Sequence, residues 1–563
     1  MKNNMKKWLS AAVLAICSLI MLTSCSHDDD KYEKKVYPVT DDERVSYAEK
    51  ILGVTIDKEQ DWVLTREYSV KITADADLSN IVNVMVLDAH PYVGENFCIA
   101  SAVQTNGGSA TLSFRAPKAA DILYAACVNL DGECIARPFT PGVDASVSFH
   151  EQLPKVAAAP ATTRRSYNVI DMPQSDMFYV KDFYSFRRAV RKALPEGQDN
   201  RKLIGDFEYS NTVEVRKNPY SIYDLPLAYI GGNGSYTDNL AYTYYKEGQD
   251  IEPNDTFLIK DTYPTGWSDK EYDSSARAYK LEGHRLQHLQ DATLVTTFTS
   301  TDMVRFHMAQ NEKIIVKDTI PLVKVFLFNG YVFVACEEGN NWDYNDRLFM
   351  MPQGADRLEK IKAIPVKPDP SKPRVWTYAW EDKDFGDYDM NDCVIQVKEN
   401  VNDPNKLDIT LVALGATHEL WLGFDNPNAQ SHLDYQHVFE NELHQVMGVS
   451  QSTMVNTGRA WAKPVTVTLE KPAYFDFQTC SFVLGVKVEP EMQSVYESDY
   501  YYIKIATKGQ DPHGIVIPEE WRWPTETTCI KDAYPKFVEW SADHTQALDW
   551  YKYPVESKVY STK

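Results

Sequence analysis

Two acidic segments of similar sequence, 46 residues apart, each connect one apolar run to the next. The first contains Asn-Asn-Trp-Asp-Tyr-Asn-Asp at residues 340–346, and the second contains Gly-Asp-Tyr-Asp-Met-Asn-Asp at residues 386–392. The flanking runs are short and apolar, as buried β-strands are. The repeat therefore predicts two strand–loop–strand elements whose loops carry the same chemistry, and it favours a chain made mainly of β-structure.

The oxygen-rich side chains of these segments suit a hard cation. Ca²⁺ takes six to eight oxygens from carboxylates, amides and carbonyl groups. Alternate residues of an extended segment point to one side, so Asp387, Asp389 and Asn391 would present their oxygens together. We therefore expect Ca²⁺ as a cofactor. The candidate metal ligands are Glu337, Glu338, Asn341, Asp343, Asn345 and Asp346 in the first segment, and Glu381, Asp382, Asp387, Asp389, Asn391 and Asp392 in the second.

The spacing is not that of an EF-hand. Counted from Asp387, the sixth position is Asp392 rather than glycine, and the twelfth is Lys398 rather than glutamate. A second interpretation stays open, in which the Asp and Asn side chains only cap turns by accepting backbone N–H bonds.

The second segment also carries a family resemblance. Trp380-Glu381-Asp382 followed by Gly386-Asp387-Tyr388-Asp389-Met390-Asn391-Asp392-Cys393-Val394 resembles the F-E-D…G-D-Y-D-x-N-D-x-V motif of LruC-type domain-containing lipoproteins of Bacteroidetes. Trp380 and Cys393 depart from that motif without removing an oxygen. Further similarity lies in Leu411–Leu422, residues 513–518 and residues 533–540. The resemblance implies a C-terminal β-domain of unknown function and names no reaction.

The first residues predict export and a lipid anchor. Lys2, Lys6 and Lys7 precede an apolar stretch of 15 residues, which is too short to span a bilayer. Leu22-Thr23-Ser24-Cys25 resembles a lipobox, which implies acylation of Cys25 and attachment to outer-membrane lipid. The acidic run after Cys25 resembles a surface-export tag. We therefore expect a lipid-anchored outer-membrane protein that faces the cell exterior.

The pattern of strands, turns and Pro-rich joints predicts several domains. Short alternating strands with Asn-Gly-Gly and Asp-Gly turns indicate an Ig-like β-sandwich near the N-terminus. A middle α+β domain and a C-terminal β-sandwich-like LruC-type domain come next. The predicted boundaries are a signal peptide at 1–24, a tether at 25–45, the sandwich at 46–155, a linker at 156–180, the middle domain at 181–364 and the C-terminal domain at 365–563.

Composition excludes several functions. The formal charge of −22 argues against nucleic acid as a partner. No HExxH, GxSxG or P-loop pattern occurs, so we expect no enzyme. His284 and His288 indicate an exposed helix face. The seven cysteines beyond Cys25 have no zinc or disulfide spacing and are expected in apolar strands.

Aromatic residues leave a choice of function open. Tyrosines at 236–245 in predicted loops would suit glycan stacking, whereas the tail tryptophans are expected to fill a core. Our first hypothesis is a non-catalytic surface binding or adhesion module with Ca²⁺-stabilised acidic loops, whose partner is a glycan or a host or cell-surface protein. The alternatives are a glycan-capturing or glycan-hydrolysing surface protein and a structural component of the cell envelope.

Overall fold

The computed structural model is mainly β, with 42% of residues in strands and 12% in helices. It describes residues 39–561 except 92–95, 143–144, 150–167, 171–176, 180–182, 205–210, 217–221, 224, 233–238, 247–255, 260–274, 282, 288–293, 311–312, 316–320, 352–353, 366, 368–370, 430–434, 491–492 and 494–498. The predicted signal peptide, Cys25 and the acidic run after it lie outside the described residues. Within them, no helix combines the length and the apolar character needed to cross a bilayer.

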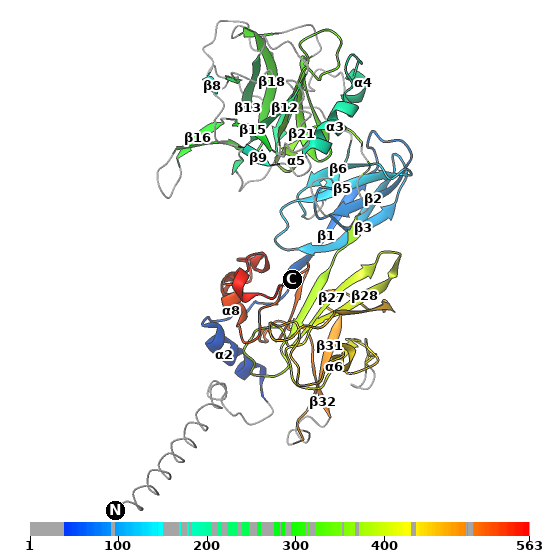
Figure 1. Cartoon of the computed structure of the whole chain (residues 1–563), viewed down its shortest axis with the longest axis vertical. Helices are drawn as coiled ribbons and strands as arrows, with labels where there is room; N and C mark the ends of the chain where they lie inside the picture. Colours follow the sequence, from blue (N-terminus) through cyan, green and yellow to red (C-terminus); the bar gives the residue numbers. More distant parts are fainter. Residues whose placement is uncertain are drawn as a thin grey trace, which may run out of the picture. The chain divides into compact units, whose positions relative to one another are not determined.

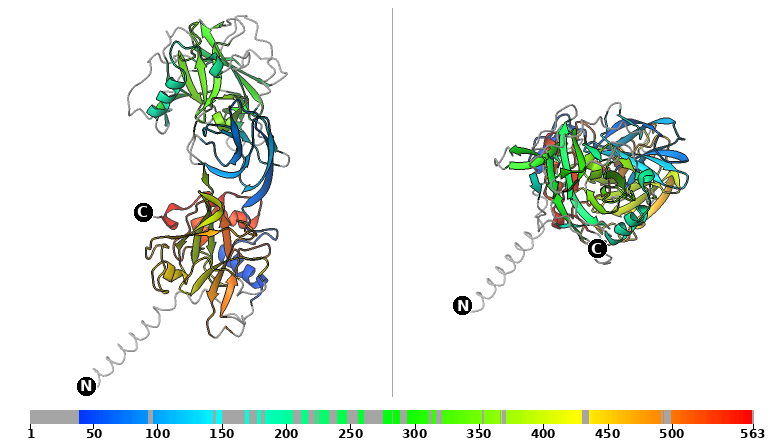
Figure 2. Two further views of the ribbon diagram at one scale, coloured as in Figure 1. Left: turned by 90° about the vertical axis from the view of Figure 1, so that its right-hand side faces the viewer. Right: turned by 90° about the horizontal axis from the view of Figure 1, so that it is seen from above.

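The chain divides into two compact units (Figure 1). The terminal unit comprises Met1–Arg66, Pro117–Ala119 and Arg374–Lys563, and the central unit comprises Glu67–Ala116 and Ala120–Pro373. The beginning of the described chain, in blue, and its end, in red, thus belong to the same unit (Figure 2).

The first part of the central unit is a sandwich of two sheets around one apolar core. Alternation along β1 buries Val70 and Ile72 and leaves Lys71 exposed, as expected for a strand that covers a core on one face. In spatial order, one sheet consists of β4 (Ser109–Pro117), β1 (Thr65–Thr73) and β7 (Ala145–Val147). The other consists of β25 (Lys372–Pro373), β3 (Phe97–Val103), β2 (Ile81–Leu87), β5 (Leu123–Asn129) and β6 (Cys134–Phe139).

The rest of the central unit contains two seven-stranded sheets that share one apolar core. The first consists of β23 (Leu358–Glu359), β10 (Thr212–Val215), β18 (Asp302–Gln310), β13 (Asn239–Lys246), β14 (Thr256–Ile259) and β8 (Asn168–Ile170), with β19 (Lys313–Ile314) beside β18. The second consists of β24 (Lys362–Ala363), β20 (Val323–Phe328), β21 (Tyr331–Cys336), β22 (Arg347–Met351), β12 (Pro226–Gly231), β15 (Ser275–Lys280) and β9 (Met177–Tyr179).

Helices cover the other face of the second of these sheets. Val190 of α3 (Phe183–Ala193), Leu194 just after this helix and Ile204 of α4 (Arg201–Ile204) pack with Phe333 and Leu348 of the sheet. The remaining described elements are α5 (Gly354–Arg357) and a small sheet of β11 (Ile222–Tyr223), β17 (Leu294–Thr299) and β16 (His284–Gln287). The expected helix at His284 is therefore wrong, because this segment pairs with β17 as a strand.

The terminal unit repeats this order of layers. Along β26 (Trp376–Trp380), Trp376, Tyr378 and Trp380 face the core between two sheets, while Ala379 faces the helices. One sheet consists of β30 (Val465–Glu470), β28 (Asp403–Ala413), β27 (Cys393–Asn400), β26 and β33 (Gly514–Ile517), and the other of β29 (Leu420–Phe424), β31 (Phe482–Lys487) and β32 (Tyr500–Ile503). The helices are α2 (Asp41–Leu52), α6 (Leu443–Val446), α8 (Ile530–Ala533) and α9 (Lys536–Ala542), with 3-10 turns η4 (Trp550–Lys552) and η5 (Glu556–Lys558).

Both ends of the described chain build the helical layer of this unit. Helix α2 begins at a capping box of Thr40 and Glu43 and ends at Gly53, whose φ of 73° suits glycine. The ring of Trp62 stacks on Phe537 and meets Trp540 edge-on. The expectation that the tail tryptophans fill a core is thus confirmed, since Trp521, Trp523, Trp540 and Trp550 are all buried.

Candidate functional site: two matched acidic loops

Each acidic segment closes an antiparallel pair of strands. The first acidic loop, residues 337–346, joins β21 to β22, and Cys336 pairs with Arg347 at its base. The second acidic loop, residues 381–392, joins β26 to β27, and Trp380 pairs with Cys393. The repeated sequence therefore forms the same strand–loop–strand element twice, once in each unit.

The backbone inside the loops is curled rather than extended. Trp342 and Tyr344 of the first loop have φ of 58° and 54°, and the matching Tyr388 and Met390 of the second have 54° and 54°. Left-handed conformations are uncommon for such side chains and persist only where the surroundings hold them. The expected extended segment is wrong in this respect, and the cause is a buried glutamate.

That glutamate is the first residue of each loop and accepts hydrogen bonds from backbone N–H groups inside the curl. Glu337 Oε2 accepts from Tyr344 N at 3.3 Å. Glu381 Oε1 accepts from Met390 N at 2.7 Å, and its Oε2 accepts from Tyr388 N at 3.2 Å. The side chain of Glu381 also occupies the space beside Gly386, because a Cβ there would lie 1.9 Å from Glu381 Oε2.

The last aspartate of each loop closes it by capping the residue after this glutamate. Asp346 Oδ2 accepts from Glu338 N at 2.5 Å, and Asp392 Oδ2 accepts from Asp382 N at 2.7 Å. This is the turn-capping role that the second interpretation of the sequence gave to the Asp and Asn side chains. Glu337, Glu381, Asp346 and Asp392 therefore shape the loops by accepting backbone N–H bonds. This role does not explain the positions of all the other carboxylates in the loops.

Three carboxylates converge in each loop. Oxygens of Glu337, Asp343 and Asp346 lie within 4.8 Å of one another, as do those of Glu381, Asp387 and Asp389. The other candidate residues point to different partners. Two of them form ion pairs: Glu338 Oε1 lies 2.8 Å from Arg347 Nε, and Asp382 Oδ2 lies 2.5 Å from His418 Nδ1. The three asparagines donate through their side-chain amides. Asn341 Nδ2 donates to Asp343 Oδ2 at 2.7 Å, and those of Asn345 and Asn391 donate to Leu194 O and Pro524 O, both at 3.2 Å.

Burial and mutual repulsion make these carboxylates hard to ionise. Burial, with repulsion from Asp346, raises the pKa of Glu337 to about 7. Burial, with repulsion from Asp387, raises the pKa of Glu381 to about 8. The pKa values of Asp389 and Asp392 also lie well above the ordinary range, chiefly because of burial. Such groups favour either a proton or a nearby cation at neutral pH.

The donor set fits a hard cation. The side chain of Glu337 is 0% exposed, and the only donors that act on its carboxylate among the described residues are the backbone N–H groups of Tyr344 and Gly339. The converging ligands are all carboxylate oxygens, with no sulfur or imidazole nitrogen in either cluster. Oxygen-only sets suit Ca²⁺ rather than zinc or copper.

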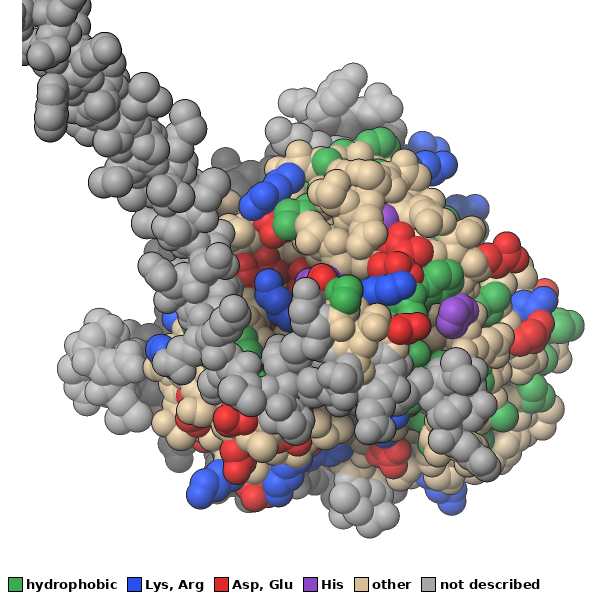
Figure 3. Space-filling view, turned by 90° about the horizontal axis from the view of Figure 1, so that it is seen from below, with side chains coloured by type: hydrophobic (Ala, Val, Ile, Leu, Met, Phe, Trp, Pro, Cys, Tyr) green, Lys and Arg blue, Asp and Glu red, His purple; other side chains and the backbone are tan. Residues whose placement is uncertain are grey.

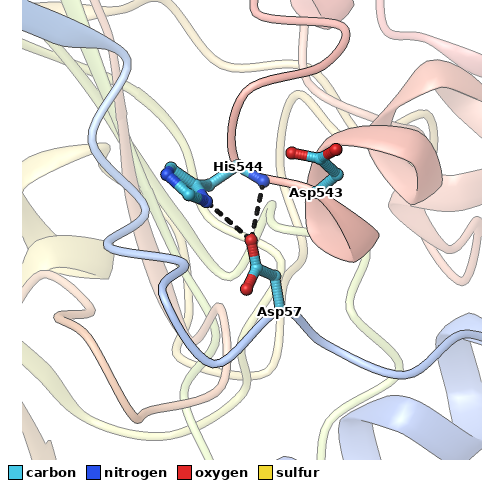
Figure 4. Close-up of side chains that lie close together, drawn as sticks. All are labelled: Asp57, Asp543 and His544. Atoms are coloured by element: carbon cyan, nitrogen blue, oxygen red, sulfur yellow. Dashed lines mark hydrogen bonds and ion pairs between the residues drawn. The ribbon is translucent and has the colours of Figure 1, made fainter.

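A third acidic group has a structural role. Asp57 lies beside Asp543 and His544, which come from the other end of the chain (Figure 4). Asp57 Oδ2 accepts from His544 N at 3.1 Å and lies 2.6 Å from His544 Nδ1. N–H bonds from Glu59 and His544 lower the pKa of Asp57 to about 2. These contacts fasten the segment after α2 to the end of α9.

The aromatic residues at 236–245 do not form a described surface. Tyr242, Tyr244 and Tyr245 are buried in β13, so the prediction of loops there is wrong for these residues. Strand pairing with β14 and β18 places them in the core, and Tyr236 lies outside the described residues. The seven cysteines beyond Cys25 are all free thiols in the structure.

A cavity of about 470 Å³ in the terminal unit has no counterpart in the sequence prediction. Its lining combines the rings of Tyr435 and of the Tyr500–Tyr502 run with Lys383 and Asp384 of the second acidic loop. The hydroxyl of Tyr501 donates to the carbonyl of Asp382. The cavity is therefore joined to the acidic loop by a direct bond. Only the adjacent tyrosines at 500–502 could have signalled it.

Comparison with known proteins gives one partial match. Residues 489–551 match the model of a domain of unknown function, DUF4842. That range contains β32, β33, α8 and α9, and it ends within η4. No curated protein and no solved structure matches the chain.

Proposed function

We propose that the protein is a non-catalytic, lipid-anchored surface module of the outer membrane, whose acidic loops bind Ca²⁺ and thereby stiffen it for binding or adhesion. The observation that carries the Ca²⁺ part is the recurrence of three converging, largely buried carboxylates in two loops of the same curled backbone. In the second loop Asp392 supplies the capping bond, so turn capping does not explain why Asp387 converges with Glu381 and Asp389. The anchor rests on the lipobox-like residues before Cys25.

Calcium-dependent melting tests the loops. Ca²⁺ should raise the melting temperature of the full-length chain, because a ligand bound only by the folded state stabilises it. The double variant D387A/D389A should lose the part of this shift that arises in the terminal unit. E520Q, which removes an exposed charge of the same unit, should keep the full shift. Equal melting of wild type with and without EDTA would rule out a metal site.

Surface location needs a separate experiment. Trypsin applied to intact cells should release peptides of this chain if it faces the exterior. A well-expressed protein that yields peptides only after lysis would contradict surface exposure. The acylation of Cys25 is checked by loss of membrane attachment in C25S.

A second candidate function, glycan capture, is favoured by the tyrosine-lined cavity. Half-buried tyrosine rings beside lysine and aspartate side chains offer both stacking and hydrogen bonding to a sugar. On the face of the molecule shown in Figure 3, acidic, basic and hydrophobic side chains are intermixed, which suits a hydrated ligand better than an apolar one. Glycan-array binding that is lost in Y435A/Y502A and kept in Y553A would support this function. Absence of any glycan or protein ligand would favour a structural envelope component.

A further inference from the structure

The cavity beside the second acidic loop is lined by parts of the terminal unit that are far apart in sequence. The lining comes from β32 and the residues after it, from Arg44 of α2, from Lys383 and Asp384 of the loop, and from Tyr435; α2 and β32 are labelled in Figure 1. A volume of about 470 Å³ is within the range of small-molecule sites. The loop that carries the proposed Ca²⁺ ligands therefore also forms one wall of a cavity large enough for a sugar.

Acids of the second acidic loop hold both ends of residues 383–386, which we call the wall segment. Just before its start, Asp382 N donates to Asp392 Oδ2 at 2.7 Å. At its end, Gly386 packs directly on the side chain of Glu381, which belongs to the cluster of three converging carboxylates. A cation bound to this cluster would hold Glu381 in place, and the wall segment with it, in the shape that encloses the cavity.

Two cations of the cavity lining are already paired with acids. Arg44 Nη1 lies 2.9 Å from Asp384 Oδ1, and Lys504 Nζ lies 2.6 Å from Asp425 Oδ1. An acidic sugar would have to displace one of these acids from its partner. The hydroxyl groups of a neutral sugar both donate and accept hydrogen bonds, so they can bind to the ion pairs as they stand.

The other positively charged groups of the lining also have acids beside them. His513 Nδ1 lies 3.1 Å from Asp511 Oδ1. The exposed Lys383 is attracted to Asp382, Asp392 and other acids of the loop. The loop contains six acids, which outnumber the two charges of one Ca²⁺ and that of Lys383 together, so binding of the ion leaves acids beside this lysine. The lining as a whole therefore favours a neutral ligand over an acidic one.

The cavity also offers aromatic surface for stacking. The ring centroids of Tyr435 and Tyr502 lie 5.4 Å apart, with the ring planes at 61° to each other. Both tyrosines are half-buried, so part of each side chain stays accessible. An aromatic ring accepts the apolar face of a sugar while polar groups next to it bind the hydroxyls. Stacking surface and paired polar groups thus occur together in this cavity.

We infer that the cavity binds a neutral saccharide, and that Ca²⁺ at the second acidic loop raises the affinity for this saccharide by fixing the wall segment. The inference rests on the proposed Ca²⁺ binding and on glycan capture as the second candidate function. Coupling between two binding sites is reciprocal, so the saccharide raises the affinity for Ca²⁺ by the same factor. Couplings of this kind are typically about 5- to 150-fold.

An array of neutral and acidic glycans, read with the full-length chain in Ca²⁺ and in EGTA, tests the ligand class. Neutral glycans should bind, and more strongly in Ca²⁺. Preference for acidic glycans would overturn the inference. Absence of glycan binding in both buffers would overturn the inference together with glycan capture, and would leave the Ca²⁺-dependent melting that tests the acidic loops unaffected.

Isothermal titration with the glycan that binds best on the array tests the coupling. Its affinity should be at least fivefold higher in Ca²⁺ than in EGTA, and adding it should raise the affinity of the wild-type chain for Ca²⁺ by the same factor. Neither measurement requires a folded variant. Equal glycan affinity in the two buffers, with Ca²⁺-dependent melting intact, would overturn the inference and leave the proposed Ca²⁺ binding standing.

Variants then locate the ligand and the coupling. Y502A should lose glycan binding and keep its Ca²⁺-dependent rise in melting temperature, which shows that it folds. D389N should lose the difference in glycan affinity between Ca²⁺ and EGTA, whereas E520Q, which removes an exposed charge of the same unit, should keep it. Glycan affinity unchanged in Y502A would place the ligand outside this cavity and overturn the inference.

Discussion

The first and second acidic loops share left-handed backbone conformations at two matched positions and differ in how their negative charge is compensated. Glu338 of the first loop pairs with Arg347, whose side chain is 1% exposed and always charged. At the matching positions the second loop has Asp382 and Cys393, and Asp382 pairs with His418 instead. The second loop also has Asp387 where the first has Asn341. The second loop therefore has more acid, and its positive charge comes from a titratable histidine and from Lys383, which acts on several carboxylates at once rather than pairing with one.

The comparison shows that the curled backbone of the loops and their negative charge have separate causes. Matched positive φ values and matched N–H bonds occur in both loops, so the curl does not require the extra acid of the second loop. The acid content instead sets how strongly each loop depends on a cation. We expect the terminal unit to depend on Ca²⁺ more than the central unit.

The largest expected effect is that of chelation on the terminal unit. Removing Ca²⁺ that was present at about 1,000 times its Kd costs about 4 kcal/mol of stability. The terminal unit should lose most of this, while the central unit, with Arg347 in place, loses less. Differential scanning calorimetry with and without EGTA measures both, and tryptophan fluorescence identifies the terminal unit, which holds most of the tryptophans. A larger fall in the melting temperature of the central unit would contradict the expectation that the terminal unit depends more on Ca²⁺.

The next effect is that of pH on the calcium-free chain. The pKa of Glu381 is raised to about 8 by burial, far above that of an unfolded glutamate, so the folded terminal unit binds an extra proton between about pH 8 and pH 4.5. Its stability should therefore rise as pH falls through this window, and the part due to Glu381 alone is at most about 1.4 kcal/mol per pH unit. The pKa of Glu337 is raised only to about 7, so the central unit should respond at lower pH.

Thermal melts in EGTA between pH 6 and pH 8.5 measure this difference. E381Q should flatten the response of the terminal unit and leave that of the central unit unchanged. With Ca²⁺ present the sign should reverse, because protons compete with the cation for the same oxygens. Equal slopes with Ca²⁺ and with EGTA would mean that the carboxylates and the cation do not share a site.

The smallest effect comes from exchanging the residues that distinguish the loops. N341D adds a carboxylate to the first cluster and removes the Nδ2 donor to Asp343, so it should raise Ca²⁺ affinity there about tenfold. D387N should lower the affinity of the second loop by a similar factor, which is about 1.4 kcal/mol. Isothermal titration of the two variants and of the double variant checks this. Unchanged affinities would show that this position lies outside the coordination shell.

The sequence alone predicted the loops better than their surroundings. The 46-residue repeat correctly indicated two equivalent strand–loop–strand elements, because local spacing carries that information. The curl was missed, since it depends on N–H bonds to a buried glutamate seven to nine residues away. The segments that bind the loops at Leu194 and Pro524 had no recognisable signal, because they approach the loops only through the tertiary fold.

The assembly of the terminal unit from both ends of the chain imposes an order of events during synthesis. Residues 41–66 emerge early, but their packing partners Phe537 and Trp540 emerge about 470 residues later. The central unit is almost continuous in sequence and completes its core in the meantime. A nascent chain thus carries α2 and Trp62 as an exposed apolar segment until its last residues arrive. That segment is where a chaperone has the longest time to bind.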